Sequence, residues 1–231
     1  MPLTYSLTAK YRPHKIQDFI GLEKVKRVLT AFVANPYETA FLFTGPPGMG
    51  KTSMAEALVC EFFPEDMNPP MWRFHSAQCN VDEVRRMCNQ FGNADIFLSL
   101  KIRDPQRRWR FVIVDEIDEV TRPASIEFLS LLEPPPSKTI FIFTRNGPDK
   151  DDDGDLEEDK LEPRFRQRCI ELKFSSYGIQ PALASFLAKV WAAEAPKEAT
   201  QPNFGQLARN ANGSVRAALK DLELRLLTLA T

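Results

Sequence analysis

The residues best suited to chemistry lie in the segment FLFTGPPGMGKTS, which contains the pattern G-x-x-x-x-G-K-T from Gly45 to Thr52. Glycines allow backbone N–H groups to close around a triphosphate, and the N-terminus of a following helix adds partial positive charge. In this pattern Lys51 reaches the β- and γ-phosphates, and the Thr52 hydroxyl is a ligand of Mg²⁺. The spacing therefore predicts a site for ATP and Mg²⁺. The candidate phosphate-binding residues are Gly45, Pro46, Pro47, Gly48, Met49, Gly50, Lys51, Thr52 and Ser53.

Two carboxylates, Asp115 and Glu116, directly follow the apolar residues of a second stretch, RFVIVDEID. Parallel-sheet enzymes bind ligands at the carboxyl ends of their strands, so a strand here would present both carboxylates to the phosphate site. Asp115 would hold the hydrated Mg²⁺, and Glu116 would orient and deprotonate the attacking water. The alternative is a pair of solvated carboxylates at the start of a helix. The phosphate-binding pattern in the same chain favours the catalytic interpretation.

A further polar residue, Asn146, ends the apolar stretch TIFIFTRN. From a strand beside the phosphate site, its side chain could contact the γ-phosphate or the nucleophilic water. Asn also commonly starts turns, so a purely structural role is the alternative.

The elements that must position these residues begin with five short apolar stretches bounded by turn residues. Short, fully apolar strands that alternate with helices predict a buried parallel sheet. Apolar residues at helical spacing also predict a helix over residues 22–34. The predicted strands cover residues 40–44, 71–75, 110–115, 139–144 and 169–174.

The pattern changes after Phe174, where three further segments predict helices separated by Pro and Gly breaks. These segments cover residues 181–194, 204–210 and 214–229. We therefore expect an α/β core over residues 1–175 and a small all-helical subdomain over residues 176–231. An acidic segment, residues 149–159, has the charge and Gly content of a solvated loop.

The composition narrows the class of protein. The chain has 231 residues, 43% of them hydrophobic, and a formal net charge of -1. It can bury a sizeable core, and no global charge attracts it to nucleic acid or membranes. No apolar run approaches the roughly 20 residues of a membrane helix, and the N-terminal residues lack the apolar core of a signal peptide. We expect a cytoplasmic protein without a membrane partner. The four cysteines show no CxxC spacing, which favours isolated thiols over a zinc site.

The motifs, in this order and followed by a helical subdomain, resemble those of AAA+ ATPases. The segment AKYRPHKIQDFIG resembles the N-terminal segment of clamp-loader subunits, while CNVDEVRRM and DEIDEVTRPASIEFLSLLEPPP resemble helices of bacterial clamp-loader subunits and eukaryotic replication factor C. The resemblance implies a P-loop NTPase core, which is a parallel five-stranded αβα sandwich, followed by a helical lid. It also implies that an N-terminal group helps to enclose adenine, namely Tyr11, Arg12, Pro13, Ile20 and Gly21.

The same resemblance assigns roles to two arginines. Clamp-loader subunits carry a Ser-Arg-Cys motif whose arginine reaches the ATP of the neighbouring subunit, and RFRQRC places Arg168 at that position, with Gln167 in place of Ser. NGSVRAAL resembles the family's sensor 2, which implies that Arg216 contacts the γ-phosphate from the start of a lid helix. The alternatives are that Arg168 pairs with the acidic segment 149–159 and that Arg216 is a solvated surface residue.

The resemblance also implies partners. We expect the chain to act with copies of itself or with related AAA+ subunits, and to associate with DNA. DNA phosphates would be contacted by Arg85, Arg86 and Arg122, without contacts to bases. The basic run KIRDPQRRWR includes Trp109, which could stack on bases, but we interpret the run as a solvated loop.

These observations predict a Mg²⁺-dependent ATP hydrolase that uses the ATP cycle to load or remodel a protein partner, such as a sliding clamp, on DNA. Clamp-loader subunits normally carry a collar domain, which is expected to begin where this sequence ends. The alternative function is a nucleotide-gated assembly or recruitment factor, such as a mobile-element or phage regulator. In that alternative, ATP binding builds a ring or filament on DNA, and hydrolysis only resets it.

Overall fold

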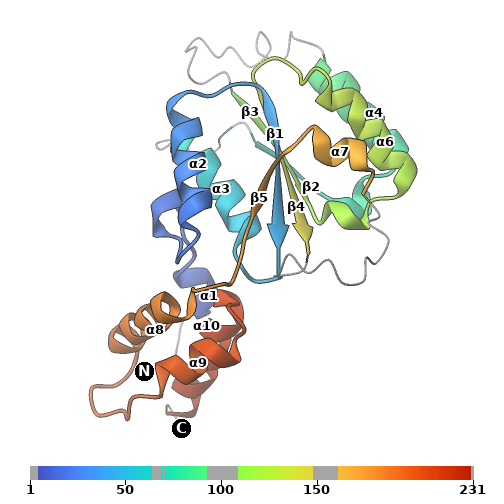
Figure 1. Ribbon diagram of the computed structural model, residues 1–231. Coiled ribbons are helices and arrows are strands. Elements are labelled where there is room, and N and C mark those ends of the chain that lie inside the picture. The colour runs from blue at the N-terminus through green and yellow to red at the C-terminus, as the bar shows by residue number, and fades with distance from the viewer. Residues whose placement is uncertain (1–4, 64–68, 70, 93–108, 148–160, 230–231) are drawn as a thin grey trace.

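A parallel β-sheet forms the centre of the larger part of the molecule (Figure 1). The computed structural model describes residues 5–63, 69, 71–92, 109–147 and 161–229. Within them, five strands pair in the order β2-β3-β4-β1-β5, and every neighbouring pair is parallel. The predicted α/β fold class is confirmed. The strands are β1 (Thr39–Gly45), β2 (Met71–His75), β3 (Arg110–Asp115), β4 (Thr139–Asn146) and β5 (Ile170–Lys173).

Helices cover both faces of this sheet (Figure 1). One face packs against α2 (Glu23–Ala34) and α3 (Lys51–Phe62), and the other against α4 (Val81–Gly92), α6 (Arg122–Leu132) and α7 (Pro163–Gln167). Short 3₁₀ turns join some elements, namely η1 (Ile16–Asp18), η2 (Ser76–Gln78) and η4 (Ile117–Glu119). The sheet is therefore the middle layer of three.

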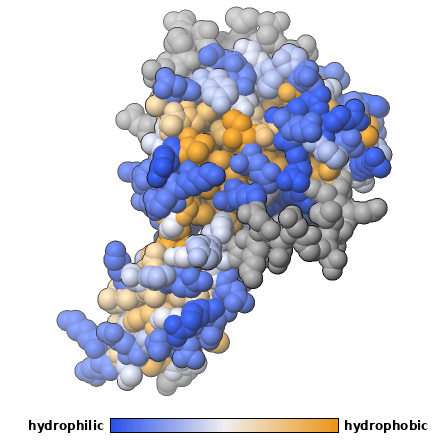
Figure 2. Space-filling view, in the orientation of Figure 1, coloured by the Kyte–Doolittle hydropathy of each residue, from blue (hydrophilic) through white to orange (hydrophobic). Residues whose placement is uncertain are grey.

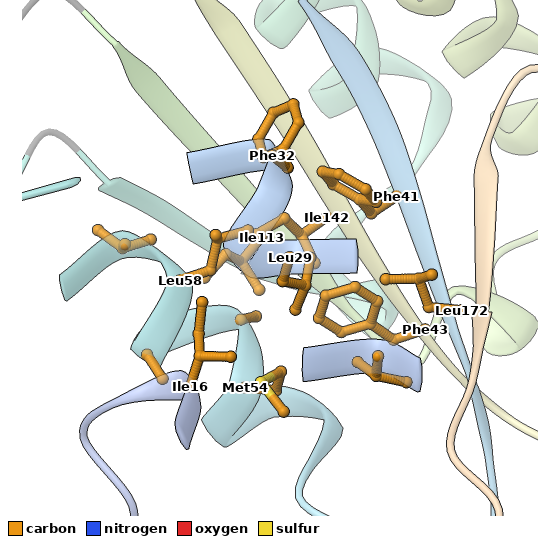
Figure 3. Close-up of a cluster of buried hydrophobic side chains, with 14 of the residues drawn as sticks. Ile16, Leu29, Phe32, Phe41, Phe43, Met54, Leu58, Ile113, Ile142 and Leu172 are labelled. Atoms are coloured by element: carbon orange, nitrogen blue, oxygen red, sulfur yellow. The ribbon is translucent and has the colours of Figure 1, made fainter. Parts of the chain in front are cut away.

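The two faces of the sheet have separate apolar cores. Successive side chains of a strand point to opposite faces. On β1, Phe41 and Phe43 accordingly pack beneath α2 and α3 (Figure 3), while Leu42 packs beneath α4 and α6. Every residue of β1 and β3 is buried. This double burial explains why the strands are apolar without alternation in the sequence.

Proline marks the first turn of three helices, α6, α7 and α8 (Gln180–Glu194). The prolines are Pro123, Pro163 and Pro181. A first-turn residue has no intrahelical acceptor for its N–H, so proline is tolerated there and its fixed φ favours the helix.

The helical part of the molecule lies beyond the carboxyl ends of the strands (Figure 1). It contains α8, α9 (Phe204–Asn210) and α10 (Val215–Thr228). Their apolar cluster also includes the fully buried Leu7 of the short α1 (Leu7–Lys10). The N-terminal segment therefore packs against the C-terminal helices, which sequence reasoning had placed in a separate subdomain. The division near residue 175 stays a prediction.

The molecular surface is mixed in character. Hydrophilic side chains are spread over the visible face of both the α/β part and the helical part (Figure 2). Among the described residues, no helix combines the length and the apolar character that crossing a membrane requires.

Candidate nucleotide-binding site

A pocket of about 710 Å³ lies between the carboxyl ends of the strands and the helical part. Its wall combines the loop after β1, the start of α3, the ends of β3 and β4, and side chains from α1, α8 and α10. Parallel α/β sheets bind ligands at this edge because the connecting loops diverge there. The volume and position suit a nucleotide. The predicted residues in the wall are Tyr11, Arg12, Pro13, Ile20, Pro47, Gly48, Met49, Gly50, Lys51, Thr52, Ser53, Glu116, Asn146 and Arg216.

The predicted phosphate loop joins β1 to α3, and α3 begins at Lys51 as the motif requires. Gly48 has a φ of +82°, a backbone conformation that residues with a side chain rarely adopt. A Cβ at this position would overlap the Ser214 hydroxyl at the start of α10. The loop therefore packs directly against the helical part, and only glycine fits at the contact.

Lys51 is buried beneath this loop. Its Nζ donates to Gly45 O at 2.7 Å, Pro46 O at 2.9 Å and Asn146 Oδ1 at 3.0 Å. Gly45 and Pro46 therefore contact Lys51 through their backbone carbonyl oxygens. Burial lowers the pKa of Lys51 to about 8, although the neighbouring Asp118 and Glu116 oppose that shift. A bound phosphate would favour the charged form of this lysine.

Asp115, at the end of β3, is a buried carboxylate that accepts hydrogen bonds from several neighbouring side chains. Its Oδ1 accepts from Thr52 Oγ1 at 2.7 Å and from Thr144 Oγ1 at 3.1 Å. Its Oδ2 lies 2.8 Å from Nε and 2.7 Å from Nη2 of Arg73. The structure therefore brings Thr52 and Asp115 together, as the sequence predicted for a shared metal ion, and adds an arginine to the pair.

Hydroxyl and carboxylate oxygens are ligands that Mg²⁺ prefers, so Thr52 and Asp115 fit that ion chemically. A second group of possible ligands lies nearby, in which His75, Glu116 and Glu119 each place one ligand atom within 4.8 Å of the others.

Glu116 lines the pocket in an uncommon backbone conformation, with φ 59° and ψ 49°. Its N–H donates to Thr144 Oγ1 at 3.0 Å, which helps to hold the turn. Its Oε2 lies 3.3 Å from His75 Nε2. Non-glycine residues in the left-handed region carry strain and concentrate at active sites. The geometry is compatible with the predicted catalytic role.

Asn146 and Arg216 approach the pocket from opposite sides. Asn146 ends β4, and its side chain accepts the hydrogen bond from Lys51. Arg216 lies in the first turn of α10, whose N-terminus is capped by Ser214. A cation at that end of a helix opposes the helix dipole, so an anion bound in the pocket would offset the repulsion.

Two of the N-terminal residues predicted to enclose adenine, Tyr11 and Arg12, are held by contacts with α8 and α3. Tyr11 Oη donates to Glu194 of α8 at 2.5 Å. Arg12 Nη2 lies 2.6 Å from Glu56 Oε2, and Arg12 Nε donates to Ser53 Oγ at 3.2 Å. Gly21 is not part of the pocket wall; a Cβ there would approach Ile179 to 3.3 Å.

Arg168 does not line the pocket and lies at the end of α7 on the molecular surface. Its Nε donates to Glu133 Oε2 at 2.6 Å, and its Nη1 donates to Arg164 O at 3.1 Å. Arg164 and Arg166 pair with Glu162 and Glu171 respectively. The alternative partner for Arg168, the acidic segment 149–159, lies outside the described residues.

The predicted DNA-contacting arginines are all exposed on α4 and α6, the two helices that pack together on one face of the sheet. Arg85 pairs with Glu127, Arg86 with Glu83, and Arg122 with Glu162. Trp109 is buried against Phe62, with Lys138 Nζ over its ring, so its face is not available for stacking on a base. Residues 101–108 of the basic run lie outside the described residues.

Sequence reasoning missed several residues at the site. Arg73 and His75 lie on β2, which carries no motif, and Phe186 lies on α8. Alternation along β2 places Arg73 and His75 on the same face, but it does not say which carboxylates they meet. Only Thr144 had a usable signal, because it is a hydroxyl residue at the end of an apolar strand next to Asn146.

The comparison with protein families decides the family. The model of the ATPase family associated with various cellular activities (AAA) matches residues 41–168, more than half of the chain. The chain belongs to the AAA family of ATPases. Membership implies that this AAA protein binds ATP. The matched region includes the phosphate loop, Asp115, Glu116 and Asn146, and it ends at Arg168.

Among characterised proteins, this AAA protein is related to replication factor C small subunits. It is 31% identical over 168 residues to the one from Picrophilus torridus, covering 72% of this chain and 48% of the relative. For the one from Haloarcula marismortui the identity is 26% over 220 residues, with coverage of 93% and 60%. The chain thus spans about half to three fifths of the length of these relatives.

Solved structures agree on the fold of this AAA protein. A Thermotoga maritima RuvB structure is 16% identical, with a TM-score of 0.66, and the match covers 95% of this chain and 67% of that one. Because nearly the whole chain is covered, the likeness includes the C-terminal helices as well as the sheet.

Proposed function

We propose that this AAA protein is a Mg²⁺-dependent ATP hydrolase whose active site is completed by Arg168 of a neighbouring subunit, and that it uses ATP turnover to load or remodel a ring-shaped protein on DNA. The observation that carries the proposal is the position of the polar residues. Lys51, Glu116, Asn146 and Arg216 line one pocket, whereas Arg168 lies outside it on the surface.

Each pocket residue has its own role in the proposed phosphoryl transfer. Backbone N–H groups of the phosphate loop and the charged Lys51 hold the β- and γ-phosphates. Asn146 and Arg216 contact the γ-phosphate from the sheet and from α10. Glu116 accepts a proton from the attacking water. Thr52 and Asp115 would hold Mg²⁺, which would supply positive charge against the phosphates.

Arg168 supplies the remaining positive charge from another subunit. An arginine finger stabilises the charge of the transferring phosphoryl group and can contribute roughly 10³- to 10⁵-fold to the rate. Its guanidinium pairs with Glu133, and the side chains of Arg168 and Glu133 are 27% and 67% exposed, so part of the pair is accessible to an approaching subunit. Hydrolysis would then depend on assembly.

The clamp-loading part of the proposal rests on the relationship to replication factor C small subunits and on the resemblance of the N-terminal and helical motifs. A pocket wall built from both the sheet and the helical part supplies a physical basis. ATP bound there would contact both parts and bias the angle between them, which is a common route from binding to movement.

The test is ATP turnover per protomer over a wide range of protein concentrations, for the wild type and for Arg168→Ala. Turnover of the wild type should rise with concentration because assembly brings Arg168 to a neighbouring pocket, and the variant should stay flat. Arg164→Ala is the matched control, because it removes an exposed arginine of the same helix that pairs with nearby Glu162. It should behave as the wild type.

Equal turnover of the wild type and Arg168→Ala at every concentration would contradict a role for Arg168 in trans among copies of this chain. Assembly on DNA that requires ATP binding but proceeds at full extent without hydrolysis would instead support the assembly or recruitment function. Stimulation of turnover by a sliding clamp would support loading.

A further inference from the structure

Arg73, on β2, contacts the proposed Mg²⁺ ligand Asp115, and the proposed reaction gives this arginine no role. Nε and Nη2 of Arg73 both approach Asp115 Oδ2, at 2.8 and 2.7 Å. The other carboxylate oxygen, Oδ1, accepts from Thr52 and Thr144. Both oxygens of the proposed metal ligand are therefore engaged by donors of the protein itself.

A second carboxylate holds Arg73 from the opposite side. Arg73 Nη1 donates to Glu56 Oε1 of α3 at 2.8 Å, while Glu56 Oε2 lies 2.6 Å from Nη2 of Arg12. Arg73 thus has an anchor that does not depend on Asp115. If its contact with Asp115 opens, the guanidinium stays at the pocket wall, to which it already contributes.

The contact with Asp115 has an electrostatic consequence for a metal ion. Asp115 is nearly buried, with a side chain that is 6% exposed, so its charge is screened less than that of a surface carboxylate. A guanidinium stays charged throughout the physiological pH range. It therefore neutralises Asp115 in the absence of metal, and it repels a divalent cation that approaches the same carboxylate.

We propose that Arg73 occupies Asp115 in the nucleotide-free protein and competes with Mg²⁺ for that carboxylate, so that Arg73 sets the Mg²⁺ concentration at which nucleotide binds tightly. This inference rests on the proposed function, because it takes Asp115 as the metal ligand. When Mg²⁺ and ATP bind, Arg73 would leave Asp115 and keep its contact with Glu56.

The test uses the full chain carrying Glu116→Gln, in which hydrolysis is suppressed, with and without Arg73→Met. Methionine keeps much of the aliphatic length and removes the charge. Binding of a fluorescent ATP analogue is measured over a range of buffered Mg²⁺ concentrations. Mg²⁺ should increase the affinity for the analogue in both proteins. The Mg²⁺ concentration that gives half of this increase should be about tenfold lower in Arg73→Met than in the parent, which corresponds to about 1.4 kcal/mol in the free energy of Mg²⁺ binding. Each Mg²⁺ titration is compared with the affinity of the same protein in EDTA, because removing a cation from the pocket wall also changes the binding of metal-free nucleotide.

An unchanged or higher Mg²⁺ requirement in Arg73→Met would overturn the competition, since a positioning role for Arg73 would raise the requirement. A weaker affinity in EDTA without a lower Mg²⁺ requirement would overturn it as well, because Arg73 would then act only by binding the nucleotide phosphates. If Mg²⁺ does not tighten binding even with Arg73 present, the proposed metal site itself is wrong. If Mg²⁺ increases the nucleotide affinity of the parent but the Mg²⁺ requirement is the same in Arg73→Met, only the proposed role of Arg73 is contradicted.

Two further variants separate charge from geometry. Arg73→Lys keeps the charge but cannot donate two hydrogen bonds from one planar group, so its Mg²⁺ requirement should lie between those of the parent and Arg73→Met. Arg225→Met removes an arginine of similar exposure, 50% against 47%, from α10 and should leave the requirement unchanged. If thermal unfolding shows that Arg73→Met does not fold, Arg73→Gln replaces it in the same titration.

Discussion

Individual side chains at the pocket are held by one another before any ligand arrives. Lys51 is bound by two carbonyl oxygens of its own loop and by Asn146, and Asp115 accepts from Thr52, Thr144 and Arg73. Such contacts fix the positions of groups that would otherwise lose conformational entropy on binding. The site therefore has much of its geometry in the unbound protein.

Replacement of Glu116 by Gln tests its role as the base. We expect Glu116→Gln to slow ATP hydrolysis by about 10²- to 10⁴-fold, because an amide cannot accept the proton of the attacking water. ATP affinity should change little, because the amide has nearly the same shape and the phosphate loop is intact. Single-turnover hydrolysis and equilibrium binding of a fluorescent analogue measure the two effects. Loss of binding in step with turnover would contradict this assignment.

At the scale of elements, the contact between the phosphate loop and the start of α10 links the sheet to the helical part. The same short segment of α10 provides the capping Ser214, which packs against Gly48, and the pocket residue Arg216. A shift of α10 therefore moves an arginine relative to the phosphate loop. The short α1 adds a second link, because it packs on α10 and is followed by the adenine candidates.

The loop–helix contact predicts that the effects of two substitutions are coupled. Gly48→Ala should lower the free energy of unfolding, because its φ of +82° is strained for alanine and its Cβ overlaps the Ser214 hydroxyl. Ser214→Ala should cost about 1 kcal/mol through loss of the N-cap. In the double variant the cost of Gly48→Ala should shrink by about 0.5 kcal/mol or more, since the hydroxyl is gone. Strictly additive costs, measured by urea unfolding, would argue against the contact.

The link between Tyr11 and Glu194 predicts a pH dependence. Burial and the neighbouring Glu194 raise the pKa of Tyr11 from 10.0 to about 12, so the folded protein holds this proton more tightly than the unfolded chain. The stabilisation is complete below pH 10 and is lost as the pH rises through about 12. We expect Tyr11→Phe to lower the free energy of unfolding by about 1 kcal/mol at neutral pH. The difference from the wild type should narrow above pH 10.

The contribution of Glu194 to stability has the opposite pH dependence to that of Tyr11. Hydrogen bonds from Lys10 and Tyr11 lower the pKa of Glu194 below 4.5, so its contribution is present above that pH and is lost as the pH falls. Urea unfolding of the wild type and Tyr11→Phe between pH 4 and pH 11 follows the onset of both losses. A difference that is constant over the whole range would show that the hydrogen bond does not contribute.

At the scale of the whole molecule, the nucleotide pocket and the candidate DNA surface are separated by the fold. The pocket lies at the carboxyl edge of the sheet, whereas Arg85 and Arg122 lie on the helices that cover one face. A chain with a formal net charge of -1 depends on such a local patch for electrostatic attraction to DNA.

The patch predicts a change in the salt dependence of DNA binding. Arg85→Ala combined with Arg122→Ala should weaken binding to duplex DNA and reduce the slope of log affinity against log salt by roughly 1.8, about 0.9 for each lost phosphate contact. Fluorescence anisotropy over a range of KCl concentrations measures the slope. Lys189→Ala, which removes an exposed cation of α8 in the helical part, is the control and should leave the slope unchanged. The same slope in all three proteins would place the DNA surface elsewhere.

The strands and motifs that depend on local spacing could be predicted from the amino-acid sequence. Strands β1, β3 and β4 could be predicted because buried parallel strands are apolar throughout, whereas the edge strands β2 and β5 are only partly buried and carry polar residues. The phosphate loop could be predicted because its glycines and Lys51 follow one strand closely. The family resemblance added Arg168 and Arg216, which have no local signature of their own. Each of these depends on residues close together in the chain or on a known pattern.

Contacts between residues far apart in the sequence became known only from the packing of the elements. Only the pairing of β2 with β3 brings Arg73 to Asp115, and only packing of α1 on α10 joins the N-terminal segment to the C-terminal helices. Trp109, which is next to a basic run, proved to be buried for the same reason. Periodicity reports the face on which a side chain lies, but not the element that covers that face, because packing between elements depends on contacts far apart in the sequence.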